Sequence, residues 1–138
     1  MSVRERICEY YEALRSEEPL APFFAVEPAP VKFGVHERLR GHDAIASALA
    51  DQSRTTTEWC VDSHDLTAYQ TDGVGWFVDA VELGWTSSET GVRYEFDTRW
   101  SGTLIQEQDS WRFVTMHVSV GYDYQHDVVA VINSPDHG

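Results

Sequence analysis

The chain has 138 residues, 42% of them hydrophobic, which is most simply one domain with a core of its own. Acidic residues number 23 against ten Lys and Arg, and the net charge at pH 7 is −13. So acidic a surface repels phosphate backbones, which excludes nucleic-acid binding through a basic face. The acid-rich balance, with Lys32 as the single lysine, also suits a protein kept soluble in high salt and predicts a halophilic source.

The first residues, Met-Ser-Val-Arg-Glu-Arg, are charged where a signal peptide would need an apolar core. No stretch approaches the roughly 20 apolar residues of a membrane span. We therefore expect a cytoplasmic protein without membrane contact, in which Cys8 and Cys60 are buried thiols rather than a disulfide. The scattered histidines and the lack of a Cys-x-x-Cys pair predict neither a metal site nor a cofactor.

Three helices are predicted before any long strand. A Ser-Val-Arg-Glu capping box opens the first helix, and apolar residues at helical spacing extend it over about residues 2–16. A short second helix is predicted between Pro19 and Pro28. Residues 31–35 are expected to form a short strand and 36–40 a charged loop, after which the third helix begins at Gly-His-Asp.

From residue 55 the hydrophobic period changes from about 3.6 to 2, which predicts long antiparallel strands. Four such strands are expected, joined by polar or glycine-containing turns, at residues 55–69, 74–86, 92–105 and 111–120. Helices followed by a meander of strands indicate the α+β class. The tail, 121–138, contains an apolar run that would suit either an edge strand or a clasp on a partner.

The last two predicted strands form a long hairpin with residues 108–109 at its turn. Counting back from that turn pairs Arg99 with Val118 and Trp100 with His117. Because side chains alternate along a strand, this register assigns every hairpin residue to one of two faces.

One predicted face combines apolar residues with a single cation. Its members are Trp76, Val78, Ala80, Arg99, Ser101, Met116 and Val118. If this face lines a pocket, Arg99 is an anchor for an anion, since a guanidinium is a weakly hydrated bidentate donor. An arginine paired with a helix carboxylate is the structural alternative. Tyr10 or Tyr11 would reach the same cavity from the first helix, with packing in the core as the alternative.

The opposite predicted face gathers aromatic residues around Asp79 and His117. Asp79 is counted opposite Thr98, so its carboxylate is within reach of orienting the imidazole of His117 as a general base. A histidine that serves only the structure is the alternative. If this face is the outer one, so much aromatic surface predicts a protein partner.

Several short motifs occur in the order in which one known family has them. They are Tyr-Tyr-Glu-Ala-Leu in the first helix, Gly41 before Ala44-Ile45, and Thr98-Arg99 followed by Trp111-Arg112-Phe113-Val114 and His117-Val118-Ser119. The last group is similar to an Arg-x-Thr and Trp-x-Ile-Val-His-x-His-x-Ser pattern. Over about residues 3–120 the chain resembles the SnoaL-like branch of the nuclear transport factor 2-like (NTF2-like) superfamily, with 121–138 as a C-terminal extension.

The resemblance implies a cone, in which a strongly curved sheet wraps round the helices and leaves a pocket between them. Relatives use that pocket for isomerisation, dehydration, cyclisation or simple ligand binding, or serve as oligomerisation modules, so the fold does not name a function. Relatives commonly dimerise through the outer sheet face, which implies a homodimer. Steroid isomerases of this fold have a basic aspartate near the positions of Phe33 and Gly34, and neither residue accepts a proton. Thr115 stands where many relatives have a histidine.

These departures favour a binding protein over an enzyme. We expect the cone to take a small, largely apolar molecule with an anionic or carbonyl group. The residues expected to hold it are Arg99, Trp76, Tyr10, Tyr11, Ser101, Met116, Val118 and Phe33. An isomerase, cyclase or dehydratase that uses the same pocket with His117 and Asp79 is the first alternative, and an oligomerisation module without a ligand is the second.

Overall fold

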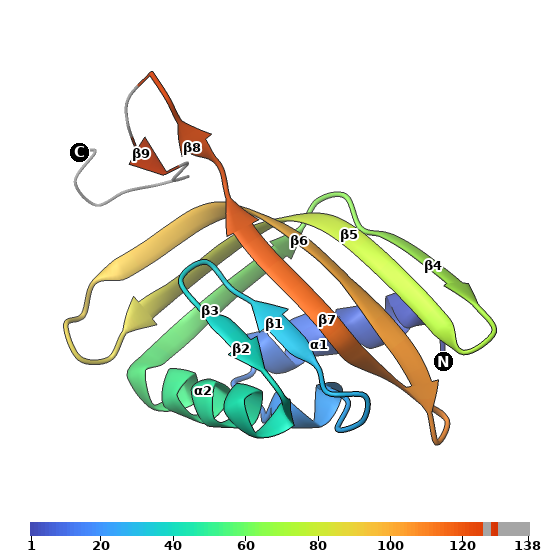
Figure 1. Cartoon of the computed structure of the whole chain (residues 1–138). Helices are drawn as coiled ribbons and strands as arrows, with labels where there is room; N and C mark the ends of the chain where they lie inside the picture. Colours follow the sequence, from blue (N-terminus) through green and yellow to red (C-terminus); the bar gives the residue numbers. More distant parts are fainter. Residues whose placement is uncertain (126–127, 130–138) are drawn as a thin grey trace.

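The structure is a computed structural model that describes residues 1–125 and 128–129. A strongly curved sheet covers the helices, which confirms the α+β class (Figure 1). The helical elements are α1 (Val3–Arg15), the 3-10 turn η1 (Ala21–Phe23) and α2 (His42–Thr55). The strands of the sheet are β1 (Val31–Phe33), β2 (Arg38–Arg40), β3 (Thr56–Ser63), β4 (Thr67–Thr71), β5 (Val74–Ser87), β6 (Arg93–Glu107) and β7 (Ser110–Val120).

Helix α1 begins and ends close to its predicted bounds because its first turn is capped. The Glu5 amide donates to the Ser2 hydroxyl (3.1 Å), and the Ser2 amide donates to the Glu5 carboxylate (3.0 Å). The helix then buries one apolar stripe under the sheet. That stripe consists of Val3, Ile7, Tyr10, Tyr11 and Leu14.

The predicted second helix is reduced to the single turn η1. The backbone just after it is drawn to the sheet, where the Ala25 amide donates to the Phe113 carbonyl (2.9 Å), and a longer helix would break that bond. The third helix is confirmed as α2. Gly41 stands before it with a φ of 91°, a conformation that glycine adopts without strain.

The strand order in the sheet is β2-β1-β7-β6-β5-β3, with β4 also paired to β5. Neighbours run antiparallel except β1 and β7, which are parallel. The expectation of a charged loop over residues 36–40 is wrong in its second half. Arg38 pairs with Phe33, so the chain turns back on β1 and forms β2 as the edge strand.

The predicted strand 55–69 is divided into β3 and β4, which both run along β5. Ser63 lies opposite Val81 and Thr67 opposite Val78. Between them, the carboxylate of Asp79 accepts hydrogen bonds from the Ser63 hydroxyl (2.6 Å) and the Asp65 amide (3.0 Å). These bonds hold the short connection out of the ladder.

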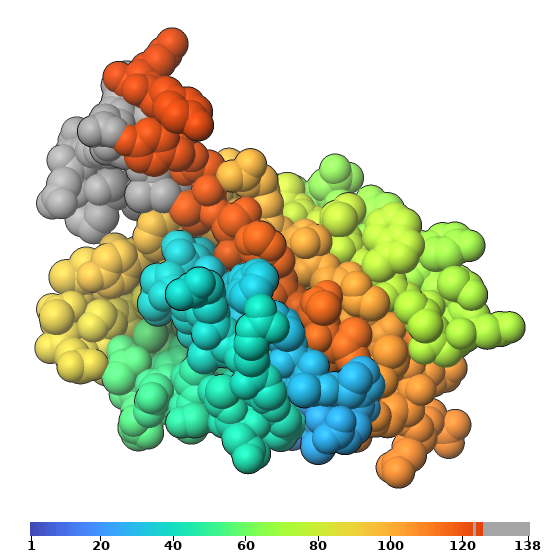
Figure 2. All heavy atoms as spheres, viewed as in Figure 1, coloured from blue at the N-terminus to red at the C-terminus, as the bar shows by residue number. Residues whose placement is uncertain are grey.

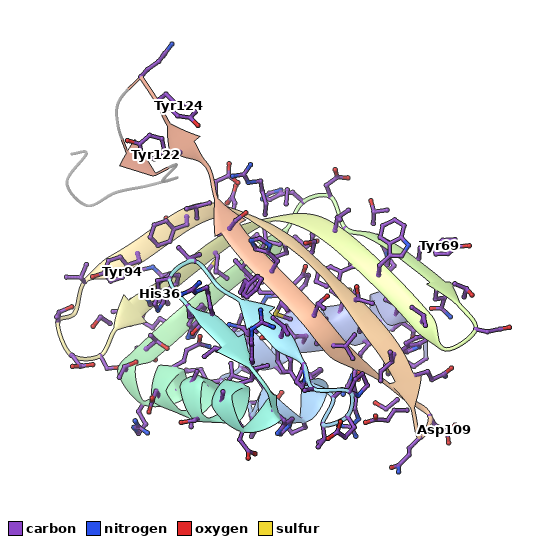
Figure 3. The ribbon with its side chains drawn as sticks, viewed as in Figure 1. His36, Tyr69, Tyr94, Asp109, Tyr122 and Tyr124 are labelled. Atoms are coloured by element: carbon purple, nitrogen blue, oxygen red, sulfur yellow. The ribbon has the colours of Figure 1, made fainter. Side chains whose placement is uncertain are left out.

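The β6–β7 hairpin turns where the sequence predicts. Glu107 faces Ser110, and Gln108 and Asp109 both have positive φ, as a two-residue hairpin loop requires. Asp109 lies at the tip of this turn (Figure 3).

Further along the hairpin, a bulge shifts the register by one residue. Leu104 pairs with Phe113, but the next pair is Thr103 with Thr115, so Val114 has no partner on β6. The β-branched and aromatic pattern of β7 is uninterrupted there, and the nearest glycine, Gly102, lies on the partner strand β6 opposite Met116.

The bulge overturns the predicted pairing of Arg99 and Trp100. Arg99 lies opposite Ser119 rather than Val118, and Trp100 lies opposite Val118 rather than His117. Because one residue of slip exchanges the two faces of a strand, Val118 joins the inner face and His117 the outer face. The predicted pair of Asp79 with Thr98 is also displaced, since Asp79 lies opposite Trp100.

Inside the cone, aromatic and aliphatic side chains form one core. Its most deeply buried large members from the sheet are Phe77, Val81, Leu104, Trp111, Phe113 and Met116. The outer face of the same strands is open to solvent, with Trp76 43% and Val78 44% exposed. The face that carries Arg99, Trp76 and Val78 was expected to line the pocket, but it is the outer face of the sheet.

A short hairpin, β8 (Tyr122–Asp123) with β9 (Val128–Val129), stands off the end of β7 (Figures 1 and 2). Tyr124 in this hairpin is 88% exposed. The apolar run predicted in the tail reaches into residues 130–138, which lie outside the described part of the chain.

Both cysteines are free, as predicted, but both are exposed rather than buried. Cys8 follows Ile7 on α1 and so lies about 100° away from the buried stripe. Cys60 lies on β3, where its thiol donates to the Asp62 carboxylate (3.4 Å). Within residues 1–125 and 128–129, no helix combines the length and apolar character needed to cross a membrane, and no three potential metal ligands come together.

Candidate functional site

The cone encloses a pocket of about 310 Å³ between the helices and the inner face of the sheet. Residues of α1, α2, the β1–β2 connection and strands β3, β5, β6 and β7 surround it. Much of its wall is aromatic. The aromatic wall consists of Tyr10, Trp59, Trp85 and Trp100.

An ion pair between a buried lysine and a half-buried glutamate projects into this pocket from β1 and the connection that follows it. The ammonium of Lys32 contacts the carboxylate of Glu37, and both residues line the pocket. Lys32 is 7% exposed, because the middle residue of β1 points inward while its neighbours point out. Burial of the lysine is compatible with its charge because Glu37 is its direct partner.

Gly34 makes this contact possible. A β-carbon at position 34 would lie 2.7 Å from Cγ and 2.8 Å from Oε1 of Glu37. The Gly34 amide also donates to the Glu37 carbonyl (3.0 Å), which closes the turn between β1 and β2. The missing side chain at Gly34 therefore lets the Glu37 carboxylate fold back over the turn onto Lys32.

Tyr10 is the other buried polar residue of the wall. Its ring is 2% exposed and makes edge contacts with Phe23 and Phe113, each at 5.3 Å between centroids. Burial raises the pKa of its hydroxyl, and the negative charge of Glu37 raises it further. The Tyr10 hydroxyl makes no hydrogen bond to another residue of the described part of the chain, so this donor remains for a molecule in the pocket.

Stacked rings continue from the pocket wall towards the end of the sheet. Trp59 and Trp85 stack at 5.0 Å, Trp85 stacks on Tyr94 at 5.7 Å, and Tyr94 lies parallel to Phe96 at 6.4 Å. Tyr94 and His36, in the β1–β2 connection, lie at the same side of the molecule, whereas Tyr69 lies at the other end of the sheet (Figure 3). The row presents flat aromatic faces beside the pocket.

A family comparison agrees with this geometry. The sequence profile described as a SnoaL-like domain matches residues 3–123. The chain belongs to the SnoaL-like family. No curated protein matches the sequence. The SnoaL-like match covers α1 through β8 and so includes every residue of the pocket.

Solved structures show that this SnoaL-like domain has the NTF2-like cone. An NTF2-like protein of unknown function from Pseudomonas putida is 14% identical over 96% of this chain and 94% of that chain, with a TM-score of 0.77. An NTF2-like superfamily protein from Salmonella enterica is 17% identical over 87% and 89%, with a TM-score of 0.76. A ketosteroid isomerase-like protein from Erwinia carotovora is 15% identical over 86% and 92%, with a TM-score of 0.72.

The pocket of the SnoaL-like domain contains two of the residues that the sequence predicted for it. Tyr10 lines it from α1, and Val118 lines it from β7. Tyr10 thus occupies the position expected for a phenol donor. Val118 faces the pocket because of the bulge, and not because it shares a face with Arg99 as predicted.

Three other predicted residues are buried in the core. Met116 is 1% exposed and packs among the apolar side chains. Tyr11 donates a hydrogen bond to the Asp79 carboxylate (2.8 Å), which already accepts from Ser63 and Asp65. Burial and this bond raise the pKa of the Tyr11 hydroxyl. Both oxygens of Asp79 are thus engaged within the fold.

The remaining predicted residues lie on the outer face of the sheet. Arg99, Ser101 and His117 border a shallow depression there, and the Phe33 ring makes an edge contact with His117 at 5.9 Å. Trp76 stacks on Tyr69 at 5.9 Å on the same surface. The predicted couple of Asp79 and His117 is wrong, because the sheet separates the inward carboxylate from the outward imidazole.

The sequence analysis missed Lys32, Glu37, Trp59 and Trp85. The resemblance to steroid isomerases directed attention to Phe33 and Gly34, whereas the residue of β1 that points inward is Lys32. One signal was available: Lys32 is the only lysine of the chain and stands in a short apolar strand.

Proposed function

We propose that this SnoaL-like protein binds a small, flat, largely apolar molecule in the cone pocket, with a carbonyl or anionic group directed at Lys32 and Tyr10. The supporting observation is a partly open pocket with four aromatic side chains in its wall and two buried donors, at 7% and 2% exposure, that both face it. Its volume of about 310 Å³ fits a small-molecule site. Flat rings favour stacking on Trp59, Trp85 and Trp100.

An enzyme of the isomerase, cyclase or dehydratase type is the second candidate. Glu37 supports it, because this residue provides the pocket with a carboxylate that could accept a proton. A structural neighbour bears the name ketosteroid isomerase-like, although 15% identity carries only the fold. His117 and Asp79 do not support this candidate, because His117 lies on the outer face of the sheet and the Asp79 carboxylate is engaged by Tyr11, Ser63 and Asp65.

Ligand binding is expected to depend on open space in the pocket. Ala48 of α2 lines the cavity, so Ala48→Phe should fill part of it and weaken binding about tenfold or more. Ala50 is on the same helix but exposed and away from the pocket, so Ala50→Phe is the matched control. We would titrate a panel of aromatic and alicyclic ketones and carboxylates and follow tryptophan fluorescence.

Saturable quenching by at least one compound, weakened by Ala48→Phe and unchanged by Ala50→Phe, is the expected result. If no compound quenches the wild-type protein, the binding function is wrong for this class of molecule. An oligomerisation module without a ligand would then be the better description.

We also propose that the protein forms a homodimer through the outer face of the sheet. Tyr69, Trp76 and Val78 are 56%, 43% and 44% exposed and lie side by side on β4 and β5. Exposed aromatic surface of this kind is unfavourable in a monomer and is typical of contact sites.

Trp76→Glu is therefore expected to weaken the dimer about a hundredfold or more, since it introduces a charge at the centre of an apolar contact. Light scattering at micromolar protein concentration gives the mass. The buffer contains molar salt, because salt screens the repulsion between subunits with a net charge of −13 over a few ångströms. The control is Tyr124→Glu, an exposed aromatic position on the β8–β9 hairpin. A wild-type mass near 15.7 kDa would contradict the proposal. If Tyr124→Glu dissociates the dimer and Trp76→Glu does not, the interface is formed by the β8–β9 hairpin instead.

A further inference from the structure

The single lysine of this chain is buried in its ligand pocket. Nine of the ten Lys and Arg residues are arginines, so a lysine at this position is the exception in the chain. A lysine differs from an arginine in one chemical respect that matters here: it can lose its proton and act as a nitrogen nucleophile towards a carbonyl carbon. The choice of Lys32 at this position therefore points to chemistry as well as charge.

The neighbours of Lys32 are those that such chemistry needs. The Glu37 carboxylate contacts the ammonium directly and is the acceptor for its proton. Tyr10 lines the same cavity as Lys32 and Glu37. Three tryptophan rings in the wall offer a stacking surface for the ring of an aromatic carbonyl compound.

We propose that Lys32 captures an aromatic aldehyde or reactive ketone in the pocket as an imine, with Glu37 as the proton shuttle. This inference rests on the proposed binding function and names the class of ligand. Glu37 takes a proton from the Lys32 ammonium, and the free amine attacks the carbonyl carbon. The resulting carbinolamine loses its hydroxyl as water after Glu37 returns the proton to that oxygen. One ammonium and one carbonyl compound thus give one protonated imine and one water.

Gly34 is the positioning residue in this scheme. A methyl group at position 34 would collide with the Glu37 side chain at 2.7 Å, and this flexible side chain would move off Lys32. Gly34 does not have a positive φ, so alanine fits its backbone conformation. Gly34→Ala therefore keeps every charge in the pocket while separating the proton shuttle from the nucleophile.

The test is reductive trapping of the full chain with benzaldehyde and sodium cyanoborohydride. Cyanoborohydride reduces the imine by hydride transfer and fixes one benzyl group on the nitrogen. The chain has only two amines, the α-amine of the N-terminus and Lys32. The α-amine is the internal reference, because an α-amino group is a better nucleophile in water at pH 7 than an ordinary lysine side chain. Peptide mass mapping after short reaction times gives the rate at each amine.

We expect Lys32 to react at least about tenfold faster than the α-amine, and saturably with benzaldehyde. Lys32→Arg should remove this fast reaction and leave the α-amine unchanged. Glu37→Gln and Gly34→Ala should each slow it about a hundredfold, in the range of general acid–base catalysis. Thermal unfolding of each variant checks that it is folded, and Gly34→Ala covers the case in which Glu37→Gln destabilises the turn.

Benzyl alcohol separates the two proposals, because it has the same ring and cannot form an imine. If benzyl alcohol quenches the pocket tryptophans and competes with benzaldehyde, yet Lys32 reacts no faster than the α-amine, the imine inference is overturned and the binding function stands. If neither compound quenches and Lys32 is unreactive, both proposals fail for this class of ligand. Fast reaction that persists in both Glu37→Gln and Gly34→Ala would also overturn the assigned role of Glu37.

Discussion

Asp79→Ala should destabilise the fold by about 3 kcal/mol or more, although Asp79 has no place in the pocket chemistry. The Asp79 carboxylate is 6% exposed and accepts hydrogen bonds from the Tyr11 hydroxyl, the Ser63 hydroxyl and the Asp65 amide. Truncation removes three hydrogen bonds to a charged group, each worth about 1.5 to 3 kcal/mol, and it leaves the buried Tyr11 hydroxyl without an acceptor. Ser63 and Asp65 are exposed, so their donors can turn to water. Urea unfolding followed by tryptophan fluorescence measures the loss.

Tyr11→Phe is the matched control for Asp79→Ala. It removes one donor and leaves Asp79 with the other two, so it should cost about 1 kcal/mol. The connection between β3 and β4 should also loosen in Asp79→Ala and not in Tyr11→Phe, which amide exchange at Asp65 detects. Equal losses of stability in the two variants would mean that the carboxylate does not hold this connection.

The second large effect is a steep loss of stability above pH 10. Tyr10 and Tyr11 are each 2% exposed, and in both the pKa is raised above its usual value of about 10, mainly by burial. Below pH 10 both phenols are protonated in the folded and the unfolded chain, so the stability is complete. Above pH 10 only the unfolded chain releases these protons, and the folded state loses stability with rising pH.

Each buried tyrosine should contribute up to about 1.4 kcal/mol per pH unit to this slope once the unfolded phenol is mostly ionised, so the pair loses about 3 kcal/mol between pH 10 and 11.5. Urea titrations at several alkaline pH values give the slope. Tyr10→Phe and Tyr11→Phe should each remove about half of it, and the double variant should remove both contributions. A wild-type slope that neither single substitution reduces would show that other groups cause the alkaline unfolding.

The elements that the sequence predicted well are those set by local chemistry. The Ser2–Glu5 capping box, the turn at Gln108 and Asp109, and the change of hydrophobic period near residue 55 all act within a few residues. Their outcomes are α1, the β6–β7 hairpin and the long strands. Tyr10 belongs with them, because helical spacing alone turns it towards the core.

The composition of the pocket was decided by contacts between distant parts of the chain. No glycine or proline of β7 marks the bulge at Val114, yet one residue of slip exchanges the faces of β7 and separates His117 from Asp79. Burial of the Lys32 side chain depends on the parallel pairing of β1 with β7, some eighty residues away in sequence. The sequence by itself determined α1, α2 and the long strands of the meander, since propensity and periodicity are local. Only the tertiary structure decided which face of the sheet encloses the cavity, because register and curvature come from long-range packing that no short pattern encodes.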